Sequence, residues 1–231
     1  SLRIDTGRFL PTWGVVKRAL HISLPMGLQQ TIMCSAYVMT TFIIAPLGTF
    51  AIAANSFGII IESLCYMPGY GIADAATTLV GQSMGAGRHE LMKRVAWLSV
   101  GLGVTVMAVM GVVMYVGAPT AMAMMTPAEE VRRLGVEVLR IEAFAEPMFA
   151  AAIVSYGVFV GAAKTLVPSI MNLVSIWGVR ISLAAMLAPS MGLRGVWIAM
   201  CIELCFRGLI FLVKLKFWNI QTSCKYYGKD Q

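Results

Sequence analysis

The stretch TTLVGQSMGAGRHELMKR, residues 77–94, begins as an apolar helix and ends in three glycines followed by Arg88, Lys93 and Arg94. Glycines beside positive charge occur in phosphate-binding loops, and also where a membrane helix ends at the cytoplasmic surface. A dinucleotide-binding turn needs GxGxxG between a strand and a helix, and a P-loop needs GxxxxGK[ST]. GQSMGAG has neither spacing, and no strand is expected before it. The stretch therefore predicts the cytoplasmic end of a membrane-spanning helix.

The composition also indicates a membrane protein. Of the 231 residues, 58% are hydrophobic and only 13% are charged, whereas soluble domains are about 25% charged. The net charge of +7 is spread in small basic groups between apolar segments, so no nucleic-acid partner is expected. The five cysteines form no CxxC pair, which argues against a redox role and predicts no metal site.

Six segments are long and apolar enough to cross a bilayer, which takes about 20 residues each. We therefore expect an all-α, polytopic membrane protein with a six-helix lobe over residues 20–217. A cytoplasmic linker and amphipathic prelude would precede it over 1–19, and a cytoplasmic tail would follow over 218–231. Pro68 predicts a kink in the second segment. The six segments are 20–46, 50–82, 95–117, 128–162, 166–188 and 193–217.

The distribution of lysine and arginine sets the expected orientation. Cytoplasmic flanks of membrane helices carry an excess of these residues, so we expect both termini in the cytoplasm and the lobe in the inner cell membrane. With this orientation the outer flanks carry Arg132, Arg133 and Arg194. The inner flanks carry Arg3, Arg8, Lys17, Arg18, Arg88, Lys93, Arg94, Lys164, Lys214, Lys216, Lys225 and Lys229.

A later stretch repeats the glycine pattern of the first. GVFVGAAK (157–164) and GQSMGAGR (81–88) share G-x-x-x-G-A-[G/A]-[R/K] at two expected cytoplasmic helix ends. The repeat indicates either an internal duplication or a GxxxG contact, which is common between membrane helices.

The segment PGYGIADAATTLVGQSMGAGRHELMKR (68–94) resembles the second helix of a lobe in the multidrug and toxic compound extrusion (MATE) family. The resemblance covers nearly the whole chain, from about Trp13 to Trp218, and is greatest to the C-terminal lobe. Further matching segments are LPMGLQQTIM (24–33), APLGTFAIAANSFGIIIESL (45–64), GVFVGAAKT (157–165) and LRGVWIAM (193–200).

The resemblance implies a fold of twelve helices in two six-helix lobes, of which this chain is the second. An N-terminal lobe of the same polypeptide would then be missing, which agrees with the absence of a starting methionine. It also implies an antiporter in the lipid bilayer that exports organic cations and other amphiphilic drugs in exchange for H+ or Na+, by alternating access. No cofactor beyond the coupling ion is implied. A single lobe would be inactive unless it is paired with another.

Glu142 and Glu146 are the leading candidates for cation coupling. They are four residues apart on the fourth helix and so share a face. Two close carboxylates repel each other, which favours a proton shared between them. Pro147 follows directly and would disturb the helix, freeing backbone carbonyls that can bind a cation. The alternative is that both acids are solvated near the outer headgroups.

Other polar groups at membrane depth are candidates for the cavity. Glu62 and Asp74 in the second helix are placed to attract a cationic substrate, although Asp74 is equally well placed to contact the cytoplasmic end of the bundle. Gln30 and Asn55, together with Gln29, either line the cavity or form hydrogen bonds between helices.

Two arginines have different expected partners. Glu203 and Arg207 are four apart with the acid first, which is the better order for an ion pair, so we expect a structural pair within the sixth helix. Arg180 has no local partner in the sequence, and we expect it to pair with an acid across the lobe.

The chain departs from the family pattern at the usual cation site. Cation-coupled members often have an acid in the seventh helix and another midway along the tenth. Here the first helix offers only Gln29, Gln30 and Cys34, and the mid-helix position of the fourth is Phe149. Coupling would then rest on Glu142 and Glu146, or on an acid in the missing lobe.

Three other functions are alternatives to drug export. A flippase for lipid-linked sugars, from the same superfamily, would need a cationic cavity for pyrophosphate. Acids outnumber arginines at membrane depth in this chain, which favours a cationic cargo instead. An intramembrane enzyme would need a Ser–His pair, paired aspartates or HExxH in the bilayer. His21 and His89 lie at the expected cytoplasmic surface, so no catalytic residues are predicted. A non-transporting membrane scaffold is the remaining alternative.

Overall fold

The computed structural model describes residues 13–218, and every regular element in this range is helical. The predicted all-α fold is therefore confirmed. The elements are α1 (Trp13–Ile44), η1 (Ala45–Leu47), α2 (Thr49–Gly85), α3 (His89–Met125), α4 (Glu129–Glu142), α5 (Glu146–Gly161), α6 (Leu166–Val174), the π-helix η2 (Ser175–Ile181), α7 (Ser182–Met191) and α8 (Leu193–Lys216).

The predicted six crossings agree with these helices. Five segments are long and apolar enough to span a membrane: α1 with η1, α2, α3, α8, and α6 continuing through η2 into α7. The sixth crossing is α4 with α5, which are bent by 59° at a break and together pass the same test. The sequence predicted one segment with a disturbance of the helix at Pro147. The break lies just before this residue, which occupies the first turn of α5.

α1 begins at Trp13, within the range 1–19 that the sequence predicted as linker and prelude, and α8 ends at Lys216. Residues 1–12 and 219–231 are outside the described residues. The predicted inner-flank charges Arg3, Arg8, Lys225 and Lys229 are among them.

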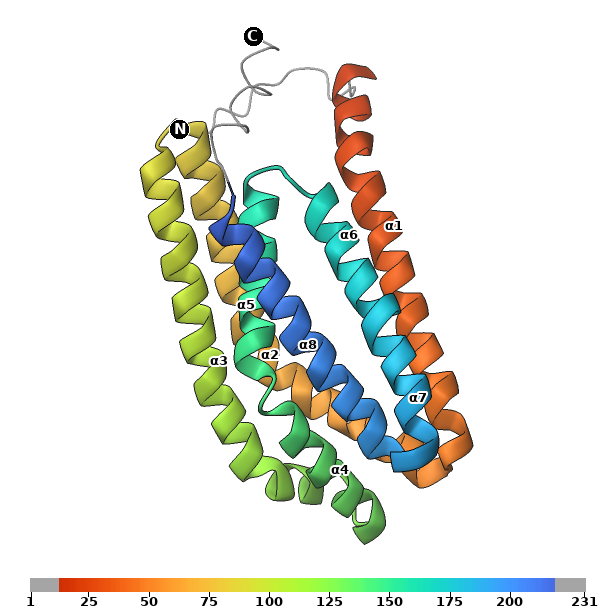
Figure 1. Cartoon of the computed structure of the whole chain (residues 1–231). Helices are drawn as coiled ribbons and strands as arrows, with labels where there is room; N and C mark the ends of the chain where they lie inside the picture. The colour runs from red at the N-terminus through yellow and green to blue at the C-terminus, as the bar shows by residue number, and fades with distance from the viewer. Residues whose placement is uncertain (1–12, 219–231) are drawn as a thin grey trace, which may run out of the picture.

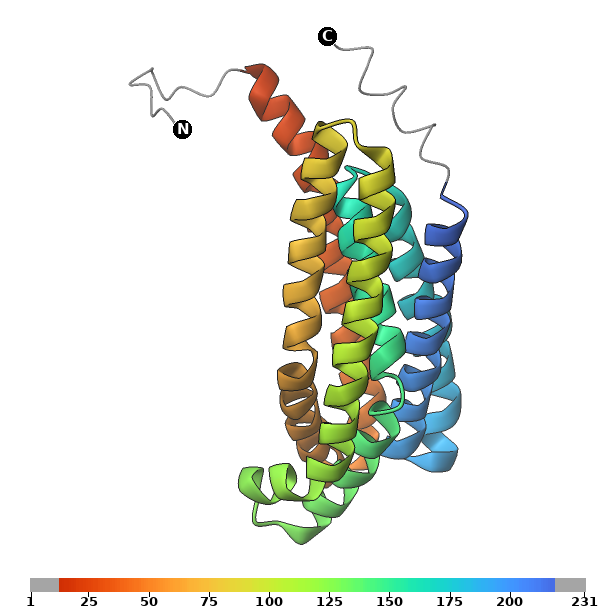
Figure 2. The same ribbon diagram turned by 90° about the vertical axis from the view of Figure 1, so that its left-hand side faces the viewer.

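The helices stand side by side as a bundle, with α1 and α6–α7 at one side and α3 at the other, and α2 crosses from the end of α1 to the start of α3 (Figure 1). α5 and α8 lie between these two sides and pack against each other. α2 bends about midway along its length (Figure 2), and Pro68 is inside this helix, where it removes a backbone hydrogen bond.

The start of α1, the α2–α3 turn, the α5–α6 connection and the end of α8 all lie at one end of the bundle (Figure 1). This end carries the predicted inner-flank residues of the described range, whereas the starts of α4 and α8 lie at the opposite end with the predicted outer arginines. The two described ends of the chain therefore lie on the same side of the expected membrane.

The opening stretch forms the α2–α3 turn. Gly87 has a φ of 68°, a left-handed conformation that favours glycine. The backbone N–H groups of Gly87 and Arg88 donate to the carbonyls of Met84 and Ser83, each at 3.0 Å, which closes the end of α2. α2 ends at Gly85, within the glycine cluster where the sequence predicted the end of the helix.

The repeated glycine pattern is a contact between α2 and α5. A Cβ at Gly157 would lie 2.6 Å from the carbonyl oxygen of Ala73, and one at Gly161 would clash with the backbone of Thr77. The Thr77 hydroxyl donates to the Gly157 carbonyl across this contact at 2.9 Å. Small residues thus let the two helices approach closely, as in other membrane helix pairs.

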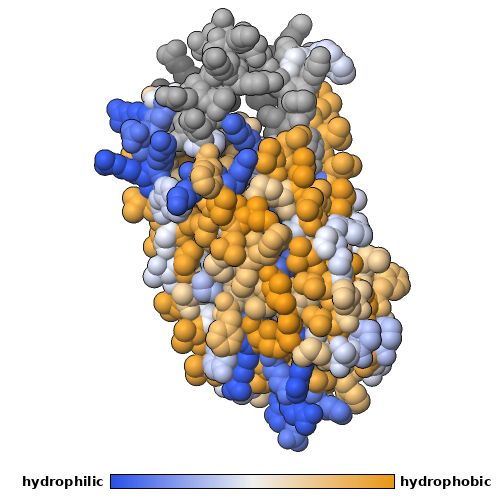
Figure 3. Space-filling view, viewed as in Figure 1, coloured by the Kyte–Doolittle hydropathy of each residue, from blue (hydrophilic) through white to orange (hydrophobic). Residues whose placement is uncertain are grey.

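The face of the molecule in Figure 3 is mostly apolar along its middle, and hydrophilic residues gather toward its two ends. Large apolar side chains on α3 such as Leu98, Val112 and Val116 are 65–72% exposed. In a soluble protein this area would be unfavourable, whereas lipid chains solvate it.

Candidate functional site

A cavity of about 280 Å³ lies among α1, α2, α5, α6 and α8. Its wall combines amides, aromatic rings and one guanidinium with a few apolar side chains. The amides and rings belong to Gln29, Gln30, Asn172, Tyr70, Phe149 and Tyr156, and the guanidinium belongs to Arg207. Pockets that bind small amphiphiles commonly have such a lining, with aromatic surface and a few polar groups that fix orientation.

Gln29 and Gln30, which the sequence placed either in a cavity or between helices, both line this cavity. Gln29 also joins helices: its side-chain oxygen lies 3.1 Å from the Tyr156 hydroxyl of α5 and 2.5 Å from the Ser169 hydroxyl of α6. The sequence did not single out Tyr156 or Ser169, because nothing local marks a partner well over a hundred residues away.

The two leading acids flank the break in the fourth crossing. Glu142 is the last residue of α4 and Glu146 the first residue of α5, and each is only 1% exposed. One carboxylate oxygen of Glu142 and both of Glu146 have no hydrogen-bond partner within residues 13–218. An unpartnered buried carboxylate is costly when charged, so both groups favour a bound proton or cation.

Glu62 joins this acidic group from α2. Its side chain is 7% exposed, and its charge acts on both Glu142 and Glu146. The charges of Arg180 and Arg207 also reach Glu62. We call Glu62, Glu142 and Glu146 the acid group. Nowhere in the described part of the chain do three His, Cys, Asp or Glu side chains form a metal-binding cluster.

The other acid predicted in α2 lies apart from the acid group. Asp74 is exposed, and its backbone carbonyl accepts a hydrogen bond from the Thr78 hydroxyl at 3.0 Å. Asn55 is half-buried, and its side-chain oxygen accepts a 3.1 Å hydrogen bond from the indole N–H of Trp197. Asn55 thus forms a hydrogen bond between α2 and α8, which is one of the two roles that the sequence left open, the other being to line the cavity.

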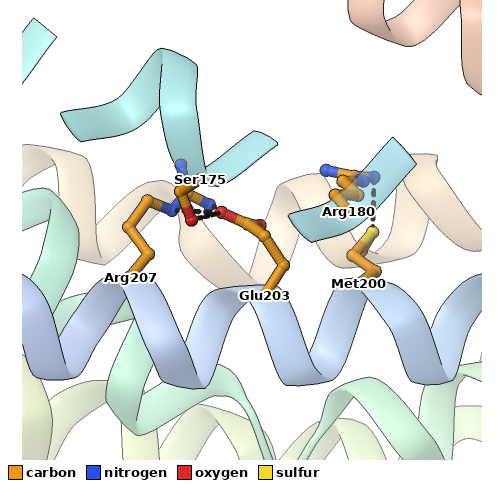
Figure 4. Close-up of polar contacts among 5 residues, drawn as sticks. All are labelled: Ser175, Arg180, Met200, Glu203 and Arg207. Carbon is orange, nitrogen blue, oxygen red and sulfur yellow. Dashed lines mark hydrogen bonds and ion pairs between the residues drawn. The ribbon is translucent and has the colours of Figure 1, made fainter. Parts of the chain in front are cut away.

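The predicted pair in α8 is present. Arg207 Nε lies 3.1 Å from Glu203 Oε1, and the same oxygen accepts a 2.6 Å hydrogen bond from the Ser175 hydroxyl (Figure 4). Glu203 is completely buried. Ser175 is the first residue of the π-helix η2, and π-helical turns are often found at functional sites. We call these three residues the Glu203 network.

Arg180 has different contacts from those expected. Its guanidinium lies 2.6 Å from the Met200 sulfur (Figure 4) and 5.8 Å from the centre of the Tyr37 ring. The charge of Arg180 acts on the carboxyl groups of Glu62 and Glu142, but neither acid is its ion-pair partner in the described structure. An ion pair between two helices joins Arg194 of α8 to Glu137 of α4, at the outer end of the bundle.

A helical lobe of up to six crossings with a polar cavity and buried acids defines a polytopic membrane protein. The MatE family profile matches residues 25–186, which is most of the chain, so this chain belongs to the MatE family. The family that the sequence resembles is therefore confirmed.

Relatives and solved structures agree with this family. The probable multidrug resistance protein NorM of Xylella fastidiosa (strain Temecula1) is 29% identical over 87% of this chain and 43% of its own length. The NorM protein of Brucella suis biovar 1 is 30% identical over 83% of this chain and 42% of its own length. The chain thus spans less than half the length of these relatives.

Two solved structures show the same fold. The MATE transporter ClbM in complex with Rb+ has a TM-score of 0.82 and 23% identity over 92% of this chain and 49% of its own. The Vibrio cholerae MATE transporter VcmN in its bent form has a TM-score of 0.83 and 17% identity over 90% and 48%. At such identities the likeness concerns the fold alone, which is one lobe of a twelve-helix transporter.

Proposed function

We propose that this chain is the C-terminal lobe of a secondary active antiporter that exports amphiphilic drugs, organic cations among them, in exchange for H+ or Na+. The N-terminal lobe of the same polypeptide would supply the facing half of the transport pathway. The protein is a transporter rather than an enzyme, and it works in the cell membrane with both described ends of the lobe on the cytoplasmic side. The multidrug resistance names of the relatives support drug export over lipid-linked sugar flipping.

One observation carries the coupling part of the proposal: the unpartnered, buried carboxylates of Glu142 and Glu146 at the break between α4 and α5. An antiporter needs a site that holds a cation in one state and releases it in another. A carboxylate with no fixed partner gains most from neutralisation, because the apolar interior penalises its charge. Glu62, whose charge reaches both, would adjust how strongly the cation is held.

The break itself suits this role. α4 and α5 meet at 59°, so a short connection rather than a continuous helix joins the two halves of the crossing. Interrupted helices place free backbone groups at membrane depth and provide a point of bending. Neutralisation of Glu142 and Glu146 would thus change the interactions at a point where the crossing can move during alternating access.

The test is export of ethidium from cells that express the complete transporter. Glu146→Gln keeps the shape of the side chain and removes its charge, so we expect loss of most export at unchanged expression. Glu137→Gln is the matched control, since Glu137 lies in α4 but is partly exposed and paired with Arg194 at the outer end. Export by the Glu146→Gln variant equal to that of the parent would remove Glu146 from the mechanism. An equal loss in both variants would mean that the effect is not specific to the site.

A further inference from the structure

Among the described residues that line the cavity, Arg207 is the one with a charged side chain. Glu62, Glu142, Glu146 and Glu203 are not among the lining residues, so Glu62, which was expected to attract a cationic substrate, is not part of this wall. Arg207 is itself 7% exposed and paired with Glu203 at 3.1 Å. The charged group that the wall offers to a ligand is therefore a guanidinium with a buried carboxylate as its partner.

The contacts of Arg207 leave it able to bind a second anion. Glu203 is completely buried and accepts a hydrogen bond from Ser175 beside Arg207 (Figure 4). The Nε atom of Arg207 lies 3.1 Å from one Glu203 oxygen without forming a hydrogen bond within the described residues, and Nη2 donates to the other oxygen at 3.4 Å. A guanidinium has five N–H donors in a planar fork that suits carboxylate, sulfonate and phosphate groups. The Arg207 guanidinium therefore has further N–H groups that can donate to a ligand in the cavity that it lines.

The aromatic rings supply the apolar part of the same site. The Arg207 guanidinium lies 5.5 Å from the centre of the Phe149 ring, within the range of a cation–π contact. Tyr70 and Tyr156 also line the cavity. Phe149 thus places an aromatic ring directly beside the arginine. Rings of this kind stack on aromatic ligands.

We propose that this cavity binds amphiphiles that carry an anionic group, a carboxylate or a sulfonate, on an aromatic body, with Arg207 as the anion-binding residue. The inference rests on the proposed function and adds to the organic cations a second class of cargo, which this cavity selects. The acid group then serves the coupling cation, and the cavity serves the cargo, so the two charges of the exchange are handled at separate places in one lobe.

The experiment compares two dyes that differ only at one carboxyl group: tetramethylrhodamine, with a free carboxylate, and its methyl ester. Binding of each dye to the purified complete transporter is measured by fluorescence anisotropy. The parent should bind the free acid more tightly than the ester. A charge-assisted hydrogen bond accounts for a preference of about tenfold.

Three variants separate binding from folding. Glu203→Gln with Arg207→Gln removes both charges of the pair and leaves no buried charge behind, and it should abolish the preference for the free acid while ester binding is kept. Glu203→Gln alone releases the guanidinium from its partner and should increase the preference. Arg194→Gln is the matched control, because Arg194 is also in α8 and paired with a glutamate but lies outside the cavity. It should leave the preference unchanged.

The outcomes distinguish this inference from the proposed function. A preference for the free acid that persists in the double variant, or a parent with no such preference, overturns the role of Arg207 even where ethidium export is intact. If the complete transporter exports neither ethidium nor the free acid nor the ester, the proposed function is overturned, and this inference with it. The inference is supported if the preference for the free acid falls in the double variant and rises in Glu203→Gln, because a general loss of structure would lower dye binding in both variants.

Discussion

Two groups of buried acids lie at membrane depth in this lobe, and they differ in their partners. Glu203 in α8 has an arginine at 3.1 Å and a serine hydroxyl at 2.6 Å. Glu142 and Glu146, on either side of the α4–α5 break, are nearly as buried, yet three of their four carboxylate oxygens have no hydrogen-bond partner among residues 13–218. The same chemical group thus occurs once in a satisfied environment and twice in an unsatisfied one.

Burial alone therefore does not define the role of an acid in a membrane. A carboxylate compensated by an arginine stays charged and holds its helices together. A carboxylate without such a partner is stable in an apolar interior when a proton or cation neutralises it. The two groups should therefore respond in opposite ways when a charge is removed.

The largest effect is expected from Arg207→Met. This change leaves the fully buried Glu203 with Ser175 as its remaining partner, and removal of one member of a buried ion pair costs about 3–5 kcal/mol. Denaturant titration of the complete transporter in detergent would measure the loss of unfolding free energy. Unchanged stability would mean that Glu203 is already neutral and that the pair is not a structural one.

A smaller loss is expected from Glu203→Gln. The glutamine can still accept from Ser175, and Arg207 can be hydrated from the cavity, so the cost is that of charge-assisted contacts, about 2 kcal/mol. The same titration measures it. A loss as large as that of Arg207→Met would indicate that the cavity does not hydrate the arginine.

Ser175→Ala should have a still smaller effect. It removes one hydrogen bond to Glu203 but keeps the ion pair, so we expect a loss of about 1 kcal/mol. Ser63→Ala is a suitable control, because the Ser63 hydroxyl bonds only to the carbonyl of Ile60 within its own helix, and Ser63 is in α2 away from this network. Equal effects of the two changes would show that Ser175 contributes nothing through Glu203.

Glu146→Gln should have the smallest effect on stability, or a favourable one. No hydrogen bond of the carboxylate is lost, and the charge that the interior penalises is removed. We expect a change within about 0.5 kcal/mol, or a gain. A loss similar to that of Glu203→Gln would reveal a partner that stabilises the charged form and would end the contrast between the two groups.

Much of the fold could be predicted from the sequence, because hydropathy marks each crossing and basic residues mark its ends. The ion pair of Glu203 and Arg207 followed from a local rule, the spacing of four residues in a helix. Pro147 likewise indicated a disturbance between α4 and α5, and the break is there. These features are determined by residues that are neighbours in the chain.

The remaining parts of the site depend on which helices meet, and local patterns do not contain this information. Ser175 lies 28 residues before its partner Glu203 and begins a π-helix that no spacing rule predicts. Glu62 reaches Glu142 from a different helix. The arginine expected to find an acid, Arg180, lies instead beside Met200 and Tyr37. Tertiary packing decides each of these contacts.

We propose that the acid group holds the coupling cation, and liposomes that contain the complete transporter provide the test. An imposed H+ or Na+ gradient should drive ethidium across the membrane of these liposomes. In the variant with both Glu142→Gln and Glu146→Gln, we expect that neither gradient drives transport, although ethidium still binds. Gradient-driven transport by this variant at the rate of the parent would mean that coupling takes place outside this lobe.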